Sequence, residues 1–269
     1  MLYIHAALAA EARPLLDHYR LRACCPDAPF RLYANDALRL VVSGPGKTAT
    51  AAAIAYTCAR FADELGPWLN VGIAGHPTAA LGTPLWVHRA TDTADDATYY
   101  PGIAFTLPCL GAPLETVDKP GGAYSDGTLC DMEGSAFFQT TQRFVAAELA
   151  HSLKVVSDNR ILPSDAMDRQ RVGPWVAGLI PLIDRLRPSL EEAASRWHIQ
   201  RCSPAYFNQA LARSRFSSAQ QHRLHLLLQQ WETLAPGQPP WDEDSADLSA
   251  RQFLDALEGR LGDERLLPY

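Results

Sequence analysis

The segment 129–136 carries residue types that can bind a sugar. It reads Leu-Cys-Asp-Met-Glu-Gly-Ser-Ala. Glu133 therefore follows a largely apolar stretch and precedes small residues that can begin a helix. A carboxylate accepts hydrogen bonds through two oxygens, and it can therefore hold two adjacent hydroxyls, as on a ribose. Met132 can pack its thioether on the sugar face. The alternative interpretation is a glutamate at a helix N-terminus, where the helix dipole favours negative charge.

Two further carboxylates stand where other predicted strands end. Asp158 follows an apolar run and Ser157, and an acid in this place can carry a proton to a purine N7, which makes the base a better leaving group. The alternative is an aspartate that caps a helix. Glu11 lies among alanines after the first predicted strand, where a partly desolvated carboxylate can orient a water. An exposed glutamate in the first turn of a helix explains the same pattern.

Strands alternating with helices must position these side chains. Apolar runs predict strands at 2–8, 68–73, 85–91, 114–117, 129–132 and 154–157, with a hairpin at 30–43. Helical spacing predicts helices at 9–19, 48–65, 134–149 and 171–194. The alternation predicts an α/β fold of three layers, α/β/α, around a central mixed sheet. Because open α/β sheets bind ligands at the carboxyl ends of their strands, we expect one cleft to collect Glu11, Glu133 and Asp158.

Two segments with glycine can bring the backbone close to a ligand. One is Gly-Pro-Gly-Lys, which begins at Gly44, and the other comprises Gly72, Ile73, Ala74 and Gly75. A turn into the following alanine-rich helix also explains the first segment, and plain strand–helix packing also explains the second. The first segment resembles the end of a phosphate loop, but that pattern requires glycine where this chain has Val41, so we reject a Walker-type site.

Composition and charge exclude several classes of function. The chain has 269 residues, 47% of them hydrophobic, and a formal net charge of −6, which argues against a nucleic-acid surface. No apolar run approaches the length of a membrane span, and the apolar start is interpreted as a strand rather than a signal peptide. Six cysteines without a CxxC pair predict free thiols and a cytoplasmic protein. No cluster has metal-ligand spacing, and we expect neither a metal nor an organic cofactor.

The character of the chain changes near residue 197. Helices are predicted at 206–212, 218–234 and 249–261. In the second of these, one face is formed by Leu224, Leu227, Leu228 and Trp231. We therefore predict a catalytic domain at 1–197 and a helical C-terminal appendage at 198–269.

Five motifs in a fixed order resemble the purine nucleoside phosphorylase and nucleosidase superfamily, over about residues 2–187. They are Ala-Ala-Leu-Ala-Ala-Glu at 6–11, Ser-Gly-Pro-Gly-Lys at 43–47, Gly-Ile-Ala-Gly at 72–75, Asp-Met-Glu at 131–133 and Val-Ser-Asp at 156–158. The likeness is greatest to the methylthioadenosine/S-adenosylhomocysteine nucleosidase branch and its hydrolytic relatives. It implies a nucleoside phosphorylase-like fold and a homodimer.

The resemblance also implies a reaction and roles. The chain would hydrolyse the N-glycosidic bond of an adenosine-type nucleoside, a small-molecule partner. Glu133 would hold the ribose hydroxyls, Met132 would pack on the sugar, Asp158 would protonate the base, and Glu11 would position the attacking water. Ser157, Gly44 and the segment 72–75 would line the substrate.

Departures from the family pattern bear on the nucleophile. The Gly-Asp-Pro-x-Arg phosphate motif of the phosphorylases is missing, and Ile73 stands where the nucleosidase branch has serine. Both differences favour water over phosphate. The segment 117–129 is also shorter than in that branch, so the base and the 5′ group of the nucleoside stay open.

Two alternatives stay open as well. A phosphorylase would transfer the glycosyl group to phosphate, and phosphate-dependent turnover would identify it. A binding module without catalysis would act through its helical appendage, although the presence of Glu11 and Asp158 argues against it. The appendage itself has three open roles: covering the 5′ side, binding a partner, or dimerisation.

Overall fold

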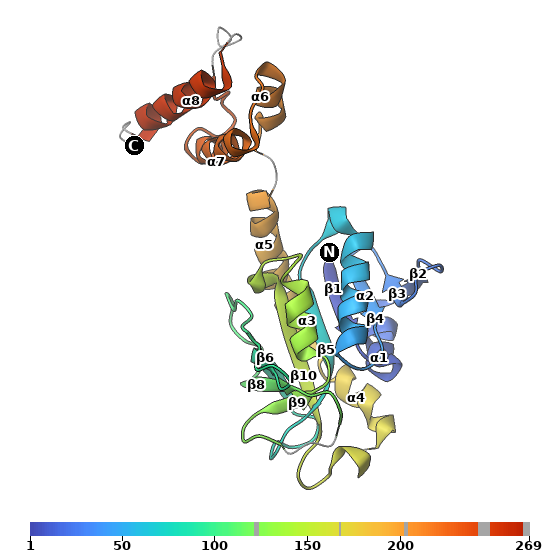
Figure 1. Ribbon diagram of the computed structural model, residues 1–269. Helices are drawn as coiled ribbons and strands as arrows, with labels where there is room; N and C mark the ends of the chain where they lie inside the picture. The colour runs from blue at the N-terminus through green and yellow to red at the C-terminus, as the bar shows by residue number, and fades with distance from the viewer. Residues whose placement is uncertain (121–123, 167, 202–203, 242–247, 266–269) are drawn as a thin grey trace. The chain divides into compact units, whose positions relative to one another are not determined.

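The computed structural model describes residues 1–120, 124–166, 168–201, 204–241 and 248–265 (Figure 1). The chain divides into two compact units, Met1–Arg196 and Trp197–Tyr269, called the first and second unit below. Among the helices of the described residues, none has an apolar stretch long enough to cross a bilayer.

A mixed sheet of ten strands forms the centre of the described part of the first unit (Figure 1). The strands are β1 (Leu2–Ala6), β2 (Arg22–Cys24), β3 (Arg31–Ala34), β4 (Leu38–Val42), β5 (Trp68–Gly75), β6 (Pro84–Asp92), β7 (Thr98–Tyr99), β8 (Gly111–Thr116), β9 (Leu129–Asp131) and β10 (Ala150–Asp158). Their order is β10-β6-β8-β9-β5-β1-β4-β3-β2, β7 pairs with β6, and β10 also pairs with β5. The strands β4, β1, β5 and β10 are neighbours and run parallel, so their carboxyl ends meet at one edge.

Helices cover both faces of this sheet. They are α1 (Ala9–Tyr19), α2 (Lys47–Arg60), α3 (Gly134–Thr141), α4 (Val172–Ala177) and α5 (Ile180–Arg201). Ile4 of β1 faces the cluster that holds Leu15 of α1 and Val176 of α4, whereas the neighbouring His5 faces α3, with its ring 6.0 Å from that of Phe137. Since successive strand residues point to opposite faces, α1 and α4 lie on one side and α3 on the other. The three-layer α/β/α prediction is confirmed.

Local sequence signals placed several elements well. The predicted helix 9–19 is α1, and the predicted hairpin is the antiparallel pair β3–β4. Its turn is held by Asn35, whose Oδ1 accepts from the backbone N–H groups of Ala37 and Leu38, both at 2.8 Å. Asparagine favours turns because its side chain bonds its own backbone in this way.

Other predicted boundaries were wrong. The helix predicted at 134–149 ends at Thr141, whose hydroxyl bonds back to the Phe137 carbonyl at 2.7 Å, and tighter turns follow. The helix predicted at 171–194 is two helices, α4 and α5, with a break at Gly178. There, one N–H reaches the carbonyls of both Pro174 and Trp175 in a tight turn. The strand predicted at 154–157 is the longer β10, and β2 was not predicted.

The second unit contains three described helices, α6 (Phe207–Arg213), α7 (Ser218–Leu234) and α8 (Ala250–Arg265). Ser217 caps α7 by accepting from the Gln220 N–H, and Gln220 bonds back to the Ser217 N–H. The face predicted for 218–234 is buried, with Leu224, Leu227, Leu228 and Trp231 packed beside Phe253, Leu254 and Leu257 of α8. This unit therefore has a hydrophobic core of its own.

Candidate functional site

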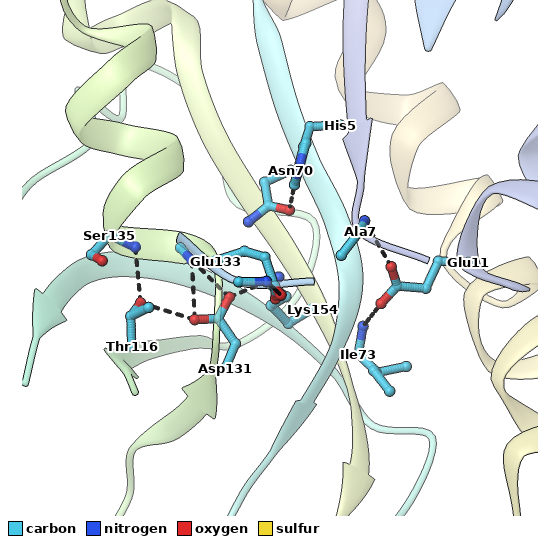
Figure 2. Close-up of polar contacts among 12 residues, drawn as sticks. His5, Ala7, Glu11, Asn70, Ile73, Thr116, Asp131, Glu133, Ser135 and Lys154 are labelled. Atoms are coloured by element: carbon cyan, nitrogen blue, oxygen red, sulfur yellow. Dashed lines mark hydrogen bonds and ion pairs between the residues drawn. The ribbon is translucent and has the colours of Figure 1, made fainter. Parts of the chain in front are cut away.

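Glu11 is buried at the carboxyl end of β1, in the first turn of α1, and only 3% of it is exposed. Its Oε2 accepts from the backbone N–H groups of Ala7 at 2.9 Å and Leu8 at 2.8 Å, and its Oε1 accepts from that of Ile73 at 2.9 Å (Figure 2). Burial raises the pKa of this carboxyl above its usual value, although Lys154 and the three N–H donors oppose the shift. The arrangement gives a fixed carboxylate of increased basicity.

Glu133 lies two residues after the end of β9, directly before α3, and 8% of it is exposed. Its Oε1 accepts from the backbone N–H of Gly46, 87 residues earlier, at 2.7 Å. Gly46 has a φ of +93°, a left-handed value that glycine adopts without steric cost. Burial and the neighbouring Asp131 raise the pKa of Glu133 to about 7. The carboxyl therefore titrates near neutral pH.

The raised pKa of Glu133 predicts a pH-dependent stability. The folded protein binds a proton here more tightly than the unfolded chain, so this contribution to the free energy of unfolding is present below about pH 4.5 and is lost as pH rises through about 7. Glu133→Gln removes the titration, and we expect its stability relative to wild type to be higher at pH 8 than at pH 5. Urea unfolding of both proteins at the two pH values measures this difference. Equal differences at both pH values would contradict the raised pKa.

A buried ion pair lies beside these two glutamates. The Nζ of Lys154 is 2.9 Å from Asp131 Oδ2, with side-chain exposures of 2% and 1% (Figure 2). Asp131 also accepts from the Thr116 hydroxyl at 2.9 Å and from the backbone N–H of Gly134. Burial lowers the pKa of Lys154, but the surrounding carboxylates raise it more, so the lysine stays charged. Its positive charge interacts favourably with the carboxylates of Asp131, Glu133 and Glu11.

Asp158 ends β10 and carries two hydroxyl donors. The Ser157 Oγ donates to Oδ1 at 2.6 Å, and the Tyr124 hydroxyl donates to Oδ2 at 2.5 Å. Burial and the bond to Asp158 raise the pKa of the Tyr124 phenol above its usual value. A Cβ on Gly75 would stand 2.6 Å from Asp158 Oδ2 and from a ring carbon of Tyr124, so only glycine leaves room for this pair.

These side chains surround one pocket of about 850 Å³. Its lining comes from the carboxyl ends of β1, β5, β9 and β10 and includes Glu11, Met132, Glu133, Tyr124 and Asp158. The volume is typical of pockets that enclose a small organic ligand. Within the described residues, no group of three His, Cys, Asp or Glu side chains is arranged to hold a metal ion.

Several solved structures of nucleosidases are similar to this chain. A methylthioadenosine nucleosidase of Arabidopsis thaliana is 17% identical, with a TM-score of 0.60 over 70% of this chain and 95% of that one. The 5′-methylthioadenosine/S-adenosylhomocysteine nucleosidase of Neisseria meningitidis, solved with methylthio-immucillin-A, is 15% identical, with a TM-score of 0.56 over 68% and 98%. The futalosine hydrolase of Helicobacter pylori is 15% identical, with a TM-score of 0.57 over 69% and 97%.

The chain has the nucleosidase fold. These neighbours are matched over nearly their whole length, so the likeness extends to the complete nucleosidase architecture. The sequence alone matched no protein-family profile and no curated protein.

The nucleosidase-fold pocket contains most of the residues predicted from sequence. Besides the three carboxylates, it is lined by Met132, Ile73, Ala74, Gly75 and Ser157. Gly72 does not line the pocket. A Cβ at this position would stand 2.6 Å from Glu11 Oε1, so the absence of a side chain here makes room for the Glu11 carboxylate. Gly44 lines a neighbouring pocket.

Sequence reasoning missed the ion pair between Asp131 and Lys154. The sequence did contain a signal, because Lys154 stands inside an apolar strand, and a lysine is almost never fully buried without a partner. The bond between Tyr124 and Asp158 was not predicted either. Local spacing does not identify such a partner, because the two residues are 34 positions apart.

Proposed function

We propose that this chain hydrolyses the N-glycosidic bond of a purine nucleoside of the adenosine type. The observation that carries the proposal is that Glu11, Glu133 and Asp158 lie around one pocket, each in a different environment. The nucleosidase fold supports the same reaction class, because the neighbours named above are nucleosidases. Glycoside cleavage by this route needs a group for the sugar, one for the nucleophile and one for the leaving base.

Glu133 is proposed to bind the ribose. Its Oε1 takes one bond from Gly46, which leaves lone pairs on both oxygens for the 2′- and 3′-hydroxyls. Met132 lines the pocket beside it and is proposed to pack on the sugar. Hydrogen bonds to a charged acceptor are stronger than neutral ones, so ribose binding favours the ionised form of Glu133.

Glu11 is proposed to position the attacking water. Three backbone donors fix the carboxylate, and its raised pKa makes it a better base than an exposed glutamate. As the glycosidic bond breaks, positive charge grows on the sugar, and the buried carboxylates stabilise it electrostatically.

Asp158 is proposed to hydrogen-bond or protonate the departing base. The hydroxyls of Ser157 and Tyr124 each occupy one acceptor position on its oxygens and hold the carboxyl group in place. A carboxyl group offers about four such positions, so the base can still bond to it. Proton transfer to the base N7 would neutralise the leaving group.

Water is proposed as the nucleophile rather than phosphate. Lys47, the cation of the segment 43–47, is ion-paired with Asp92 at 2.8 Å and Asp118 at 2.7 Å and lines neither pocket. Ile73 contributes an apolar side chain to the pocket wall next to Glu11. Both observations disfavour a phosphate anion at this place.

Base release from a panel of nucleosides, followed by chromatography with and without phosphate, tests the proposal. Adenosine, methylthioadenosine, S-adenosylhomocysteine, deoxyadenosine and inosine make up the panel. We expect free base and free sugar without phosphate. Release only with phosphate, as a sugar 1-phosphate, would identify a phosphorylase, and binding without release would identify a binding module. A cytoplasmic location and a homodimer stay predictions.

Glu133→Gln is expected to weaken nucleoside binding by about tenfold or more, because a neutral amide replaces a charged acceptor. Titration calorimetry with an adenine C-nucleoside, whose carbon–carbon glycosidic bond is not hydrolysed, measures the dissociation constant directly. The exposed Glu192→Gln in α5 is the matched control and should bind like wild type. An unchanged constant in Glu133→Gln would remove this residue from the ribose site.

A further inference from the structure

His5 is a buried polar residue that the proposed reaction does not use. It lies in β1, is fully buried, and lines neither of the two pockets described above. Its Nδ1 shares a hydrogen bond of 3.1 Å with Asn70 Oδ1 on the neighbouring strand β5 (Figure 2). Burying a polar ring costs free energy unless the ring is hydrogen-bonded, so the partners of His5 show which parts of the fold it connects.

The other ring nitrogen of His5 contacts the turn that follows β4, called the 43–46 turn below. Its Nε2 shares a hydrogen bond of 2.8 Å with Ser43 Oγ, and Ser43 Oγ also donates to the Gly44 carbonyl at 2.6 Å. Gly44 and Gly46 have φ values of +86° and +93°. Because glycine loses more conformational freedom on folding than any other residue, this turn needs side-chain contacts to keep one conformation.

The 43–46 turn contacts the proposed ribose carboxylate. The Gly46 N–H donates to Glu133 Oε1 at 2.7 Å. The ring of His5 also lies 6.0 Å from that of Phe137 on α3, the helix that begins directly after Glu133. His5 therefore contacts both the turn that donates to Glu133 and the helix that follows it.

We infer that His5 is a positioning residue for Glu133. It fixes the 43–46 turn through Ser43, and the turn in turn fixes the Gly46 N–H that orients the carboxylate. The inference rests on the proposed function, in which Glu133 holds the ribose hydroxyls. An acceptor that is already held in one orientation loses less conformational freedom on binding than a mobile one. His5 thus strengthens nucleoside binding without touching the nucleoside.

Three substitutions at His5 separate its two hydrogen bonds. Glutamine places a polar atom near the position of Nε2, asparagine places one near Nδ1, and phenylalanine keeps a ring without either. We expect the dissociation constant of an adenine C-nucleoside to rise about tenfold in His5→Phe and His5→Asn, because the bond to Ser43 is lost. His5→Gln should recover most of the affinity. In all three variants kcat should change little, because Glu11 and Asp158 take their hydrogen bonds from other residues.

His151→Phe is the matched control. His151 is as fully buried as His5, but it lies at the amino end of β10, bonds to the Glu148 carbonyl and lines neither pocket. The variant removes a buried histidine that has no contact with the 43–46 turn, so it should bind the C-nucleoside like wild type. Thermal unfolding of each variant checks that the fold is retained.

Amide hydrogen exchange at Gly46, followed by NMR, tests the same connection without a nucleoside. We expect this N–H to exchange about tenfold faster in His5→Phe, because a less constrained turn opens more often, and His151→Phe should exchange like wild type. Ser43→Ala removes the same hydrogen bond at a half-buried residue, and it provides the test where His5→Phe does not fold. The double variant His5→Phe/Ser43→Ala should exchange no faster than His5→Phe alone, because both changes remove one bond.

The outcomes separate the inference from the proposed function. Wild-type affinity, or wild-type exchange at Gly46, in folded His5→Phe or Ser43→Ala overturns the inference and leaves the nucleosidase proposal standing. Equal affinities of His5→Gln and His5→Phe also overturn it, because the bond to Ser43 would then not matter for binding. A wild-type protein that neither binds the C-nucleoside nor releases base from the panel overturns the proposed function, and the inference with it.

Discussion

Asp158→Asn is expected to lower kcat by about 10²- to 10⁴-fold, the usual contribution of a positioned general acid. Asparagine has nearly the same shape, and its amide oxygen can still accept one of the two bonds that Ser157 and Tyr124 donate. It has no proton of suitable acidity for the leaving base. Single-turnover base release from the best nucleoside of the panel measures the loss.

The Asp158→Asn experiment is compared with a control variant in the nearby loop and with a measurement of nucleoside binding. Asp126→Asn is suitable, because Asp126 is an exposed acid in the same loop as Tyr124 and pairs only with Arg160 among the described residues. We expect it to keep wild-type turnover. The affinity of Asp158→Asn for an adenine C-nucleoside should stay within a few-fold, because the ribose contacts are intact. A kcat within tenfold of wild type would reject the acid role.

Lys154→Met is expected to destabilise the fold by about 3–5 kcal/mol, the usual cost of removing one partner of a buried ion pair. The carboxylate of Asp131 would stay buried with only the Thr116 hydroxyl and the Gly134 N–H as donors. Methionine fills the space of the lysine stem, so the loss reports the missing charge rather than a cavity. Urea unfolding followed by circular dichroism measures the change.

The lysine should also affect the site electrostatically. Its charge lowers the pKa values of both Glu11 and Glu133, so Lys154→Met should shift the acid limb of the activity profile to higher pH. Lys154→Arg keeps the charge and should recover part of both the stability and the profile. A loss below about 1 kcal/mol in Lys154→Met would mean that the pair contributes little.

Features that depend on short-range contacts were predictable from the sequence, and features that depend on long-range contacts were not. The limits of α1 and the turn at Asn35 were predicted well, because a helix start and an Asx turn depend on neighbours within a few positions. The end of α3 and the division between α4 and α5 at Gly178 were not predicted. At both places the local sequence signal for a helix end is weak, and tertiary packing decides where the helix stops. The alternation of strands and helices in the sequence also indicated that Glu11, Glu133 and Asp158 follow strands whose carboxyl ends meet.

What the sequence by itself determined is therefore the set of chemical groups and the strand ends that carry them. Only the tertiary structure decided their partners: Glu133 bonds to Gly46 across 87 positions, and Lys154 pairs with an aspartate on a different strand. Burial and the charge of that aspartate set the pKa of Glu133 near 7, and neither can be read from a neighbouring residue. Desolvation and Coulomb interactions depend on distances in space, so they are determined only when the strands have paired.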